Sequence, residues 1–143
     1  MGSVEPDRGY RMLPHTADVI VSAWAPTAEG CIGEAVRGLV ATFVDVTGLA
    51  AGSSVPVSFE PAPDAEALVL VLEEVVYLLD TRQVVPVRVE LSRTPDGGLQ
   101  GRWWVVPARS GRPVGSVPKA ITRHGLRFGR DNGLWRCAVT VDV

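Results

Sequence analysis

The residues with the clearest potential for chemistry lie near the two ends of the chain. Asp142 comes immediately before the terminal carboxylate of Val143, and both belong to a segment that alternates like a strand up to the last residue. Two adjacent carboxyl groups at one strand end repel each other unless a cation or a donor lies between them. Hard oxygen ligands of this sort suit calcium or magnesium better than zinc. The end of the chain is therefore a candidate metal site.

Asp18 is the second carboxylate to consider, because aspartate has a poor preference for strands and Asp18 opens an apolar one. It would join the terminal carboxylates only if the first and last strands are neighbours in the sheet. The alternative is that the segment His15–Asp18 forms a turn in which Asp18 bonds to the backbone.

Four other polar residues lie where local structure does not obviously require them. Lys119 and His124 are placed between apolar residues of a predicted strand, and the alternative for them is an exposed lysine and a histidine satisfied by its neighbours. Asp45 and Asp80 are predicted at helix C-terminal ends, where a carboxylate opposes the helix dipole. Each could instead be a loop residue just beyond its helix.

Motifs for covalent or phosphate chemistry are absent. The sequence contains no Gly-rich phosphate loop after a strand, no Gly-x-Ser-x-Gly and no His-Glu-x-x-His. Cys137 and His124 both belong to late strands, but Cys137 falls on the apolar face of its strand, where cysteine behaves as a small hydrophobic residue. Cysteine catalysis is therefore disfavoured.

The pattern of apolar residues predicts the elements that position these groups. Residues 17–25 form a strand with two apolar faces, and Thr27 caps an amphipathic helix that we expect to end between Asp45 and Gly48. A short strand covers residues 55–60. Asp64 is expected to cap a second helix, which is apolar around most of its circumference and ends at residues 80–82.

The second half of the chain reads as strands. Residues 85–92 and 99–106 flank the turn Pro95–Gly98, and residues 120–128 and 134–143 flank a turn at 130–133. The loop between these hairpins covers residues 107–118. This order of elements predicts an α+β fold with two helices packed on a largely antiparallel or mixed β-sheet.

Length and composition limit the class of protein. The 143 residues suit one compact domain, and 14 basic against 16 acidic residues argue against strong nucleic-acid binding through bulk positive charge. No apolar run is long enough for a membrane span, and the start of the chain lacks a signal core. Cys31 and Cys137 are too far apart in sequence for a Cys-rich zinc site or a disulfide scaffold. We therefore expect a cytoplasmic protein.

Taken together, four segments resemble the archease family, small proteins that assist RtcB-type RNA ligases in tRNA splicing, tRNA processing and RNA repair. The match spans nearly the whole chain and lies in the following segments: His15–Asp18 followed by Trp24, Phe43–Asp45, Glu74–Thr81, and Lys119–Leu126 with Val141–Val143. The resemblance implies a single archease-like domain over residues 1–143, in which we expect residues 1–8 to be a flexible N-terminus.

The resemblance also implies a site and a role. Asp18, Asp142 and Val143 would bind calcium, or another hard divalent cation such as magnesium, with Asp45 and His15 as candidate accessory groups. Lys119, His124 and Asp80 are candidate partner-facing residues. The chain would have no catalytic residues of its own. It would activate the ligase by promoting its guanylylation by GTP and its multiple turnover, and would meet GTP and RNA only through the ligase.

Arg123 and Ser116–Pro118 depart from the family pattern, which commonly has a tyrosine at the first position and an acidic residue before the lysine. Two other functions remain as alternatives. The apolar second helix and the pair Trp103–Trp104 would suit a general chaperone or protein-binding module. Asp18, Asp45 and Asp142 would suit a small metal-dependent nucleotidyl or hydrolytic enzyme.

Overall fold

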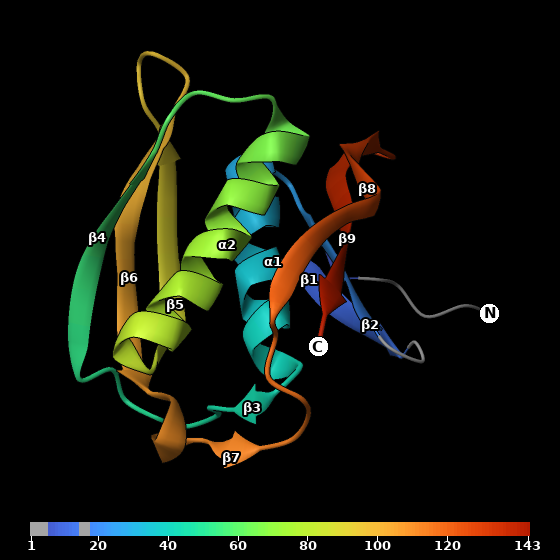
Figure 1. Cartoon of the computed structure of the whole chain (residues 1–143). Coiled ribbons are helices and arrows are strands. Elements are labelled where there is room, and N and C mark those ends of the chain that lie inside the picture. Colours follow the sequence, from blue (N-terminus) through green and yellow to red (C-terminus); the bar gives the residue numbers. More distant parts are fainter. Residues whose placement is uncertain (1–5, 15–17) are drawn as a thin grey trace.

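Residues 6–14 and 18–143 are described in the computed structural model (Figure 1), in which two helices lie between two larger β-sheets. The four-stranded sheet has the order β1-β2-β9-β8 and the three-stranded sheet the order β4-β6-β5, and all their strand pairs are antiparallel. The strands of these sheets are β1 (Gly9–Pro14), β2 (Asp18–Ala25), β9 (Leu134–Asp142), β8 (Ala120–Asp131), β4 (Ser53–Phe59), β6 (Leu99–Pro107) and β5 (Val84–Arg93). This arrangement confirms the predicted α+β class, with the strands divided between sheets.

Helix α1 (Ala28–Ala41) is the central element, packed on β2 on one side and on β5 on the other. Thr27 caps it as predicted, since its hydroxyl accepts a hydrogen bond from the amide of Gly30 at 3.0 Å. The helix ends earlier than predicted. Its last turn tightens to i→i−3 backbone bonds, in which the amide of Phe43 donates to the carbonyl of Val40 at 3.2 Å, and the hydroxyl of Thr42 donates to the carbonyl of Leu39 at 2.6 Å.

Helix α2 (Asp64–Arg82) contacts α1, β8, β5 and β4. These contacts explain why it is apolar around most of its circumference: Leu68, Leu72 and Val75 are fully buried. The predicted cap is wrong by one residue, because Pro63 occupies the cap position and Asp64 is the first helical residue. Neither α1 nor α2 is long and apolar enough to cross a membrane, and residues 6–14 and 18–143 contain no other helix that is.

Four short elements were not predicted. β1 pairs with β2 and makes β2 an inner strand. β3 (Val44–Asp45) pairs with β7 (Arg112–Pro113), and a 3-10 turn, η1 (Ala108–Ser110), precedes β7. The expected loop 107–118 is therefore partly ordered by pairing with the segment after α1.

The pairing of β2 with β9 places the chain's last strand in the middle of its sheet. Val21 and Ala23 of β2, with Val139 and Val141 of β9, are buried and face the helices. Because side chains alternate along a strand, the residues between them point to the other face of the sheet. That face carries the aspartates of the candidate site.

Candidate functional site

Asp18 and Asp142 lie directly opposite each other at one end of the β2–β9 pair. Residues in this relation have Cβ atoms about 4.5–5.5 Å apart and point to the same face of the sheet. The structure therefore answers the question that the sequence left open, because the first and last predicted strands are neighbours. Asp18 is half-buried and Asp142 is exposed.

Strand β8 pairs with β9 on the side opposite to β2 and so contacts the backbone of Asp142. Ala120 is its register partner there, and the amide of Lys119 donates a hydrogen bond to the Asp142 carbonyl at 2.7 Å. Lys119, which the sequence marked as a candidate, is thus adjacent to the aspartate pair, and it is exposed. Val143 follows Asp142 and packs partly against the core, which keeps the end of the chain against the sheet.

The groups at this end of the β2–β9 pair, the aspartate corner, that could bind a metal ion are carboxylate oxygens. Within residues 6–14 and 18–143, no three His, Cys, Asp or Glu side chains gather closely enough to hold a metal ion. The set therefore consists of two side-chain carboxylates with the terminal carboxylate of Val143 one residue away. Two carboxylates placed opposite each other are the kind of group that a hard cation stabilises, so their chemistry fits calcium or magnesium.

Asp45 lies apart from this pair in the fold, on the small β3–β7 sheet. Its carboxylate accepts a hydrogen bond from the amide of Thr47 at 2.9 Å and pairs with Arg112 at 3.1 Å. Hydrogen bonds from Thr47, together with Arg112, lower the pKa of Asp45 to about 2. Its predicted position at a helix C-terminus is wrong, because α1 ends at Ala41. The dipole argument for Asp45 therefore no longer applies.

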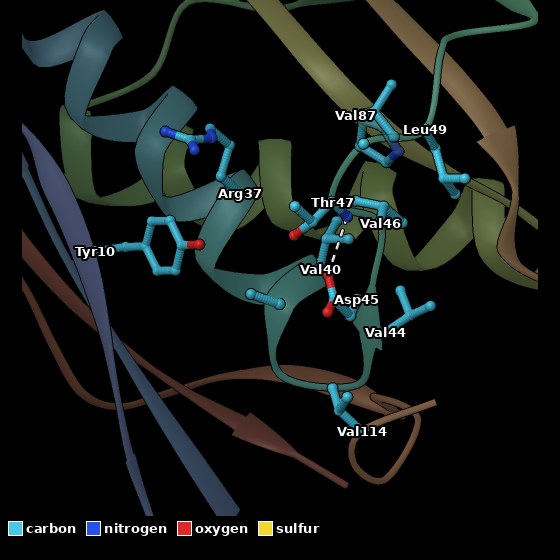
Figure 2. Close-up of a pocket in the computed structure, with 13 residues that line it drawn as sticks. Tyr10, Arg37, Val40, Val44, Asp45, Val46, Thr47, Leu49, Val87 and Val114 are labelled. Carbon is cyan, nitrogen blue, oxygen red and sulfur yellow. Dashed lines mark hydrogen bonds between the residues drawn. The ribbon is translucent and has the colours of Figure 1, made fainter. Parts of the chain in front are cut away.

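Asp45 borders a hollow of about 480 Å³ between β1, the end of α1, the following loop and β5. Figure 2 shows Asp45 with Thr47 in the middle of this hollow, Val114 on one side and Arg37 and Tyr10 across it. The guanidinium of Arg37 is held by both oxygens of Glu34, at 3.0 and 2.9 Å. The two charged groups of the hollow, Asp45 and Arg37, are thus already bonded to neighbours.

The remaining candidates are spread over the fold. His124 is exposed, in a stretch of β8 where the pairing with β9 shifts between Thr122 and Arg127, and its amide donates to the Thr122 hydroxyl at 3.3 Å. Asp80 is exposed in the last turn of α2, beside the three-stranded sheet and away from the C-terminus (Figure 1). His15, Thr16 and Ala17 lie outside the described residues.

Cys137 is buried and faces Cys31 of α1, which is also buried. The hydrogen bond between the two thiols, together with burial, raises the pKa of the Cys137 thiol far above its usual range. A thiol in that state is a poor nucleophile, because only the thiolate attacks. The expectation against cysteine catalysis agrees with this arrangement.

Sequence reasoning missed two charged contacts that shape the surroundings of these residues. The exposed Arg123 of β8 bonds to Glu66 of α2. The buried carboxylate of Glu34 binds both Arg8, at 2.9 Å, and Arg37. Only the i,i+3 spacing of Glu34 and Arg37 gave a local sign of either contact.

The fold and the aspartate corner define a class of small α+β proteins with carboxylates at the end of a C-terminal strand. The chain matches the Archease protein family (MTH1598/TM1083) over residues 10–143. It therefore belongs to the archease family.

Relatives of known sequence agree with this assignment. The "Probable protein archease" of Mycobacterium tuberculosis (strain ATCC 25618 / H37Rv) is 44% identical over 135 residues, which cover 94% of this chain and 75% of that protein. The "Protein archease" of Archaeoglobus fulgidus is 27% identical over 135 residues, covering 94% and 98%.

Two solved structures share the fold. The solution structure of Methanobacterium thermoautotrophicum protein 1598 superposes with a TM-score of 0.80 at 20% identity, covering 94% of this chain and 99% of that one. The crystal structure of a Thermotoga maritima protein described as "an archease, possible chaperone" gives a TM-score of 0.65 at 17% identity, covering 100% and 99%.

Proposed function

We propose that this chain is a metal-binding accessory protein that activates an RtcB-type RNA ligase in tRNA splicing and RNA repair. The observation that carries the proposal is the direct opposition of Asp18 and Asp142 in a chain of the archease family. It is not itself the ligase; it promotes guanylylation of the ligase by GTP and so allows multiple turnover.

Asp18, Asp142 and the terminal carboxylate of Val143 would hold calcium or magnesium at this corner. The bound cation would supply positive charge near phosphate groups, which is much of what nucleotidyl transfer requires of its surroundings. The protein itself would contribute by holding these carboxylates in fixed positions. β8 fixes the backbone of Asp142 through the Lys119 amide, so that the carboxylates are presented on a rigid strand end.

The exposed residues around the corner would meet the ligase. Lys119 is exposed next to Asp142, and His124 is exposed five residues further along β8. Lys119 directly precedes β8 and His124 lies on it, and β8 borders the aspartate pair. Both residues are therefore better placed to contact a partner bound there than Asp80 at the far end of α2.

The test is ligase turnover. The RtcB-type ligase of the same organism would be incubated with GTP, metal and an excess of broken RNA, with and without this protein. We expect a change from roughly one product per ligase to many products, as when a step that limits turnover is relieved. No change, with the ligase shown to be active, would contradict the proposal.

Variants separate the aspartate corner from the rest of the protein. Asp18→Asn, Asp142→Asn and one residue appended after Val143 should each weaken calcium binding and activation. Asp131→Asn is a matched control, because Asp131 is an exposed aspartate at the opposite end of the same β8–β9 hairpin. If the corner variants bind metal and activate like the parent, the metal mechanism is wrong even if the chain activates the ligase.

The chaperone alternative was based on an apolar second helix and the pair Trp103–Trp104, and the structure favours neither as an exposed binding surface. Trp103 is fully buried, and the apolar residues of α2 belong to the core. Trp104 is half-buried with the guanidinium of Arg88 over its ring at 4.5 Å. Suppression of client aggregation independent of metal would support this alternative, and its absence at excess over client would remove it.

A further inference from the structure

The hollow beside Asp45 has a largely aliphatic lining that the proposed function leaves unused. Its volume is about 480 Å³, which falls within the range of roughly 300–1,000 Å³ typical of binding pockets. Most of the residues that line it are aliphatic, among them Val40, Ala41, Val44, Val46, Leu49 and Val87 (Figure 2). Part of this wall belongs to Phe43–Asp45, one of the segments through which the chain resembles the archease family. That segment lies apart from the aspartate corner, so the hollow is a separate candidate for a binding site.

Two exposed valines extend this apolar surface beyond the hollow. Val114 borders the hollow and is 48% exposed, and Val117, three residues further along the same segment, is 55% exposed. Among residues 6–14 and 18–143, the other large hydrophobic side chains that are exposed are Met12 and Tyr77. Exposed apolar side chains that lie next to an apolar hollow, rather than singly, indicate an interaction surface.

The backbone that presents these valines is held in place at both ends. The amide of Val114 donates a hydrogen bond to the carbonyl of Phe43 at 3.0 Å, and the amide of Lys119 donates one to the carbonyl of Asp142 at 2.7 Å. Between them, Gly115 lies so close to the end of α1 that a Cβ atom there would overlap a backbone carbonyl. The surface is therefore preorganised, and a partner that binds it does not have to order this segment first.

The charged groups around the hollow favour an acidic partner. The side chain of Glu34 is 3% exposed, whereas Arg8 and Arg37, which bind it, are 57% and 55% exposed. The side chain of Asp45 is 36% exposed, and that of its partner Arg112 is 76% exposed. These three arginines and two carboxylates leave one positive charge in excess, and the carboxylates are the more buried groups. An approaching protein therefore meets a positive rim.

These features favour a protein over a small molecule as the occupant. A small-molecule site normally has a few free polar groups that orient the ligand, whereas Asp45 and Arg37 already have partners. An apolar pocket with a polar rim is instead the arrangement in which protein interfaces bury an anchoring side chain. The exposed valines offer further contact area, which a molecule confined to the hollow would not use.

We infer that the hollow and the two exposed valines, Val114 and Val117, form a docking site for the ligase, which inserts a large apolar side chain flanked by acidic residues. The identity of the partner rests on the proposed function. The segment from Val114 to Lys119 connects this docking site with the aspartate corner. Docking and metal-dependent activation therefore use different residues of this chain, and variants can separate them.

The test measures how tightly the parent and its variants bind the RtcB-type ligase of the same organism, in GTP and calcium, by biolayer interferometry. Val114→Glu should weaken binding at least about tenfold, because it removes an apolar contact and places a negative charge against the acidic flank. Val114→Lys should weaken it less, since lysine attracts that flank. Ala41→Leu, which fills the hollow without a change of charge, should also weaken binding. The matched control is Tyr77→Glu, the same kind of change at an exposed hydrophobic residue of α2, which should bind like the parent.

Four results would overturn the inference. The first is parental affinity in Val114→Glu and Ala41→Leu, and the second is an equal loss in Tyr77→Glu. The third is an equal loss in Val114→Lys and Val114→Glu, because the partner would then not be acidic at this point. The fourth is a parent that dimerises in sedimentation and a monomeric Val114→Glu, because a second copy of this chain would then cover the face. Unfolding midpoints show whether each variant is folded, and the uncharged Ala41→Leu tests the hollow even if a charge at Val114 is not tolerated.

Ligase turnover, measured in parallel, separates this inference from the proposed function. Stimulated turnover by a Val114→Glu variant that binds like the parent would overturn the docking site and leave the proposed function intact. Binding that is lost in Val114→Glu, with no effect of the parent on turnover, would support the docking site and contradict the proposed function. A parent that does not bind the ligase at all would overturn the docking site. In calcium, Val114→Glu should still gain stability like the parent, because the aspartate corner is unchanged.

Discussion

The guanidinium of Arg123 on β8 is hydrogen bonded to the carboxylate of Glu66 on α2. Arg123 lies in the stretch where the pairing of β8 with β9 is interrupted, next to His124. The bond therefore holds the irregular part of β8 against the first turns of α2. It also gives a structural role to one of the positions at which the chain departs from the family pattern.

The first prediction concerns the acid range. The hydrogen bond from Arg123 lowers the pKa of Glu66, so the folded protein binds a proton there less readily than the unfolded chain. The pair therefore stabilises the fold above the usual glutamate pKa, and that contribution is lost as the pH falls through the lowered folded value. We expect Glu66→Gln to flatten the acid side of a plot of unfolding midpoint against pH. Glu60→Gln, a change at an exposed glutamate beyond β4, should leave the slope unaltered, and equal slopes in all three proteins would contradict the assignment.

The second prediction concerns Glu34, whose side chain is 3% exposed while its partners Arg8 and Arg37 are 57% and 55% exposed. Removing the carboxylate leaves two arginines that water can solvate, whereas removing the arginines leaves a buried charge unpaired. We expect Glu34→Gln to cost about 1–3 kcal/mol of unfolding free energy. The double change Arg8→Gln with Arg37→Gln should cost more. Urea denaturation measures both, and the reverse order would show that the arginines contribute little.

The periodicity of apolar residues in the sequence was enough to predict the long strands and helices of this fold, including the two strands that carry Asp18 and Asp142. The alternation in residues 17–25 and 134–143 predicted β2 and β9, and the apolar circumference of α2 predicted its burial. The prediction for Asp18 came from a carboxylate that opens an apolar strand, and the prediction for Asp142 came from its place next to the terminal carboxylate of Val143. Periodicity does not predict which strands pair, because pairing depends on contacts between residues that are far apart in the sequence.

The elements that were missed show the same limit. β3 and β7 are two residues each, too short for any alternation, and they exist because Val44 and Pro113 meet in space. The end of α1 was predicted too late, because Val40 and Phe43 continue the apolar pattern while the backbone hydrogen bonds already change from i→i−4 to i→i−3 at the end of the helix. Asp45 was consequently assigned to a helix end that it does not occupy.

The third prediction concerns Gly101 in β6, the central strand of the three-stranded sheet. A Cβ atom at this position would overlap the backbone carbonyl of Glu90 on β5, which cannot move without breaking the sheet. We expect Gly101→Ala to destabilise the protein at the upper end of the roughly 1–3 kcal/mol range of overpacking. Gly52→Ala is the control, because open space surrounds that position. Thermal unfolding of the two variants measures the difference, and similar midpoints would mean that β5 and β6 are further apart than described.

The last prediction tests the aspartate pair without the ligase. Like charges directly opposite each other on neighbouring strands are destabilising, and a cation between them reverses the sign. In a chelator, Asp142→Asn should therefore stabilise the protein by about 0.2–1 kcal/mol, because one of the two charges is removed.

In excess calcium the parent should instead be more stable than Asp142→Asn. The parent gains stability because the metal binds the folded state alone, while Asp142→Asn gains little since one donor has lost its charge. Asp131→Asn should follow the parent in both conditions. The unfolding midpoints of the three proteins, measured with chelator and with calcium, give the answer directly. If calcium raises the midpoint of Asp142→Asn as much as that of the parent, the cation binds elsewhere, and the opposition of Asp18 and Asp142 is not a metal site.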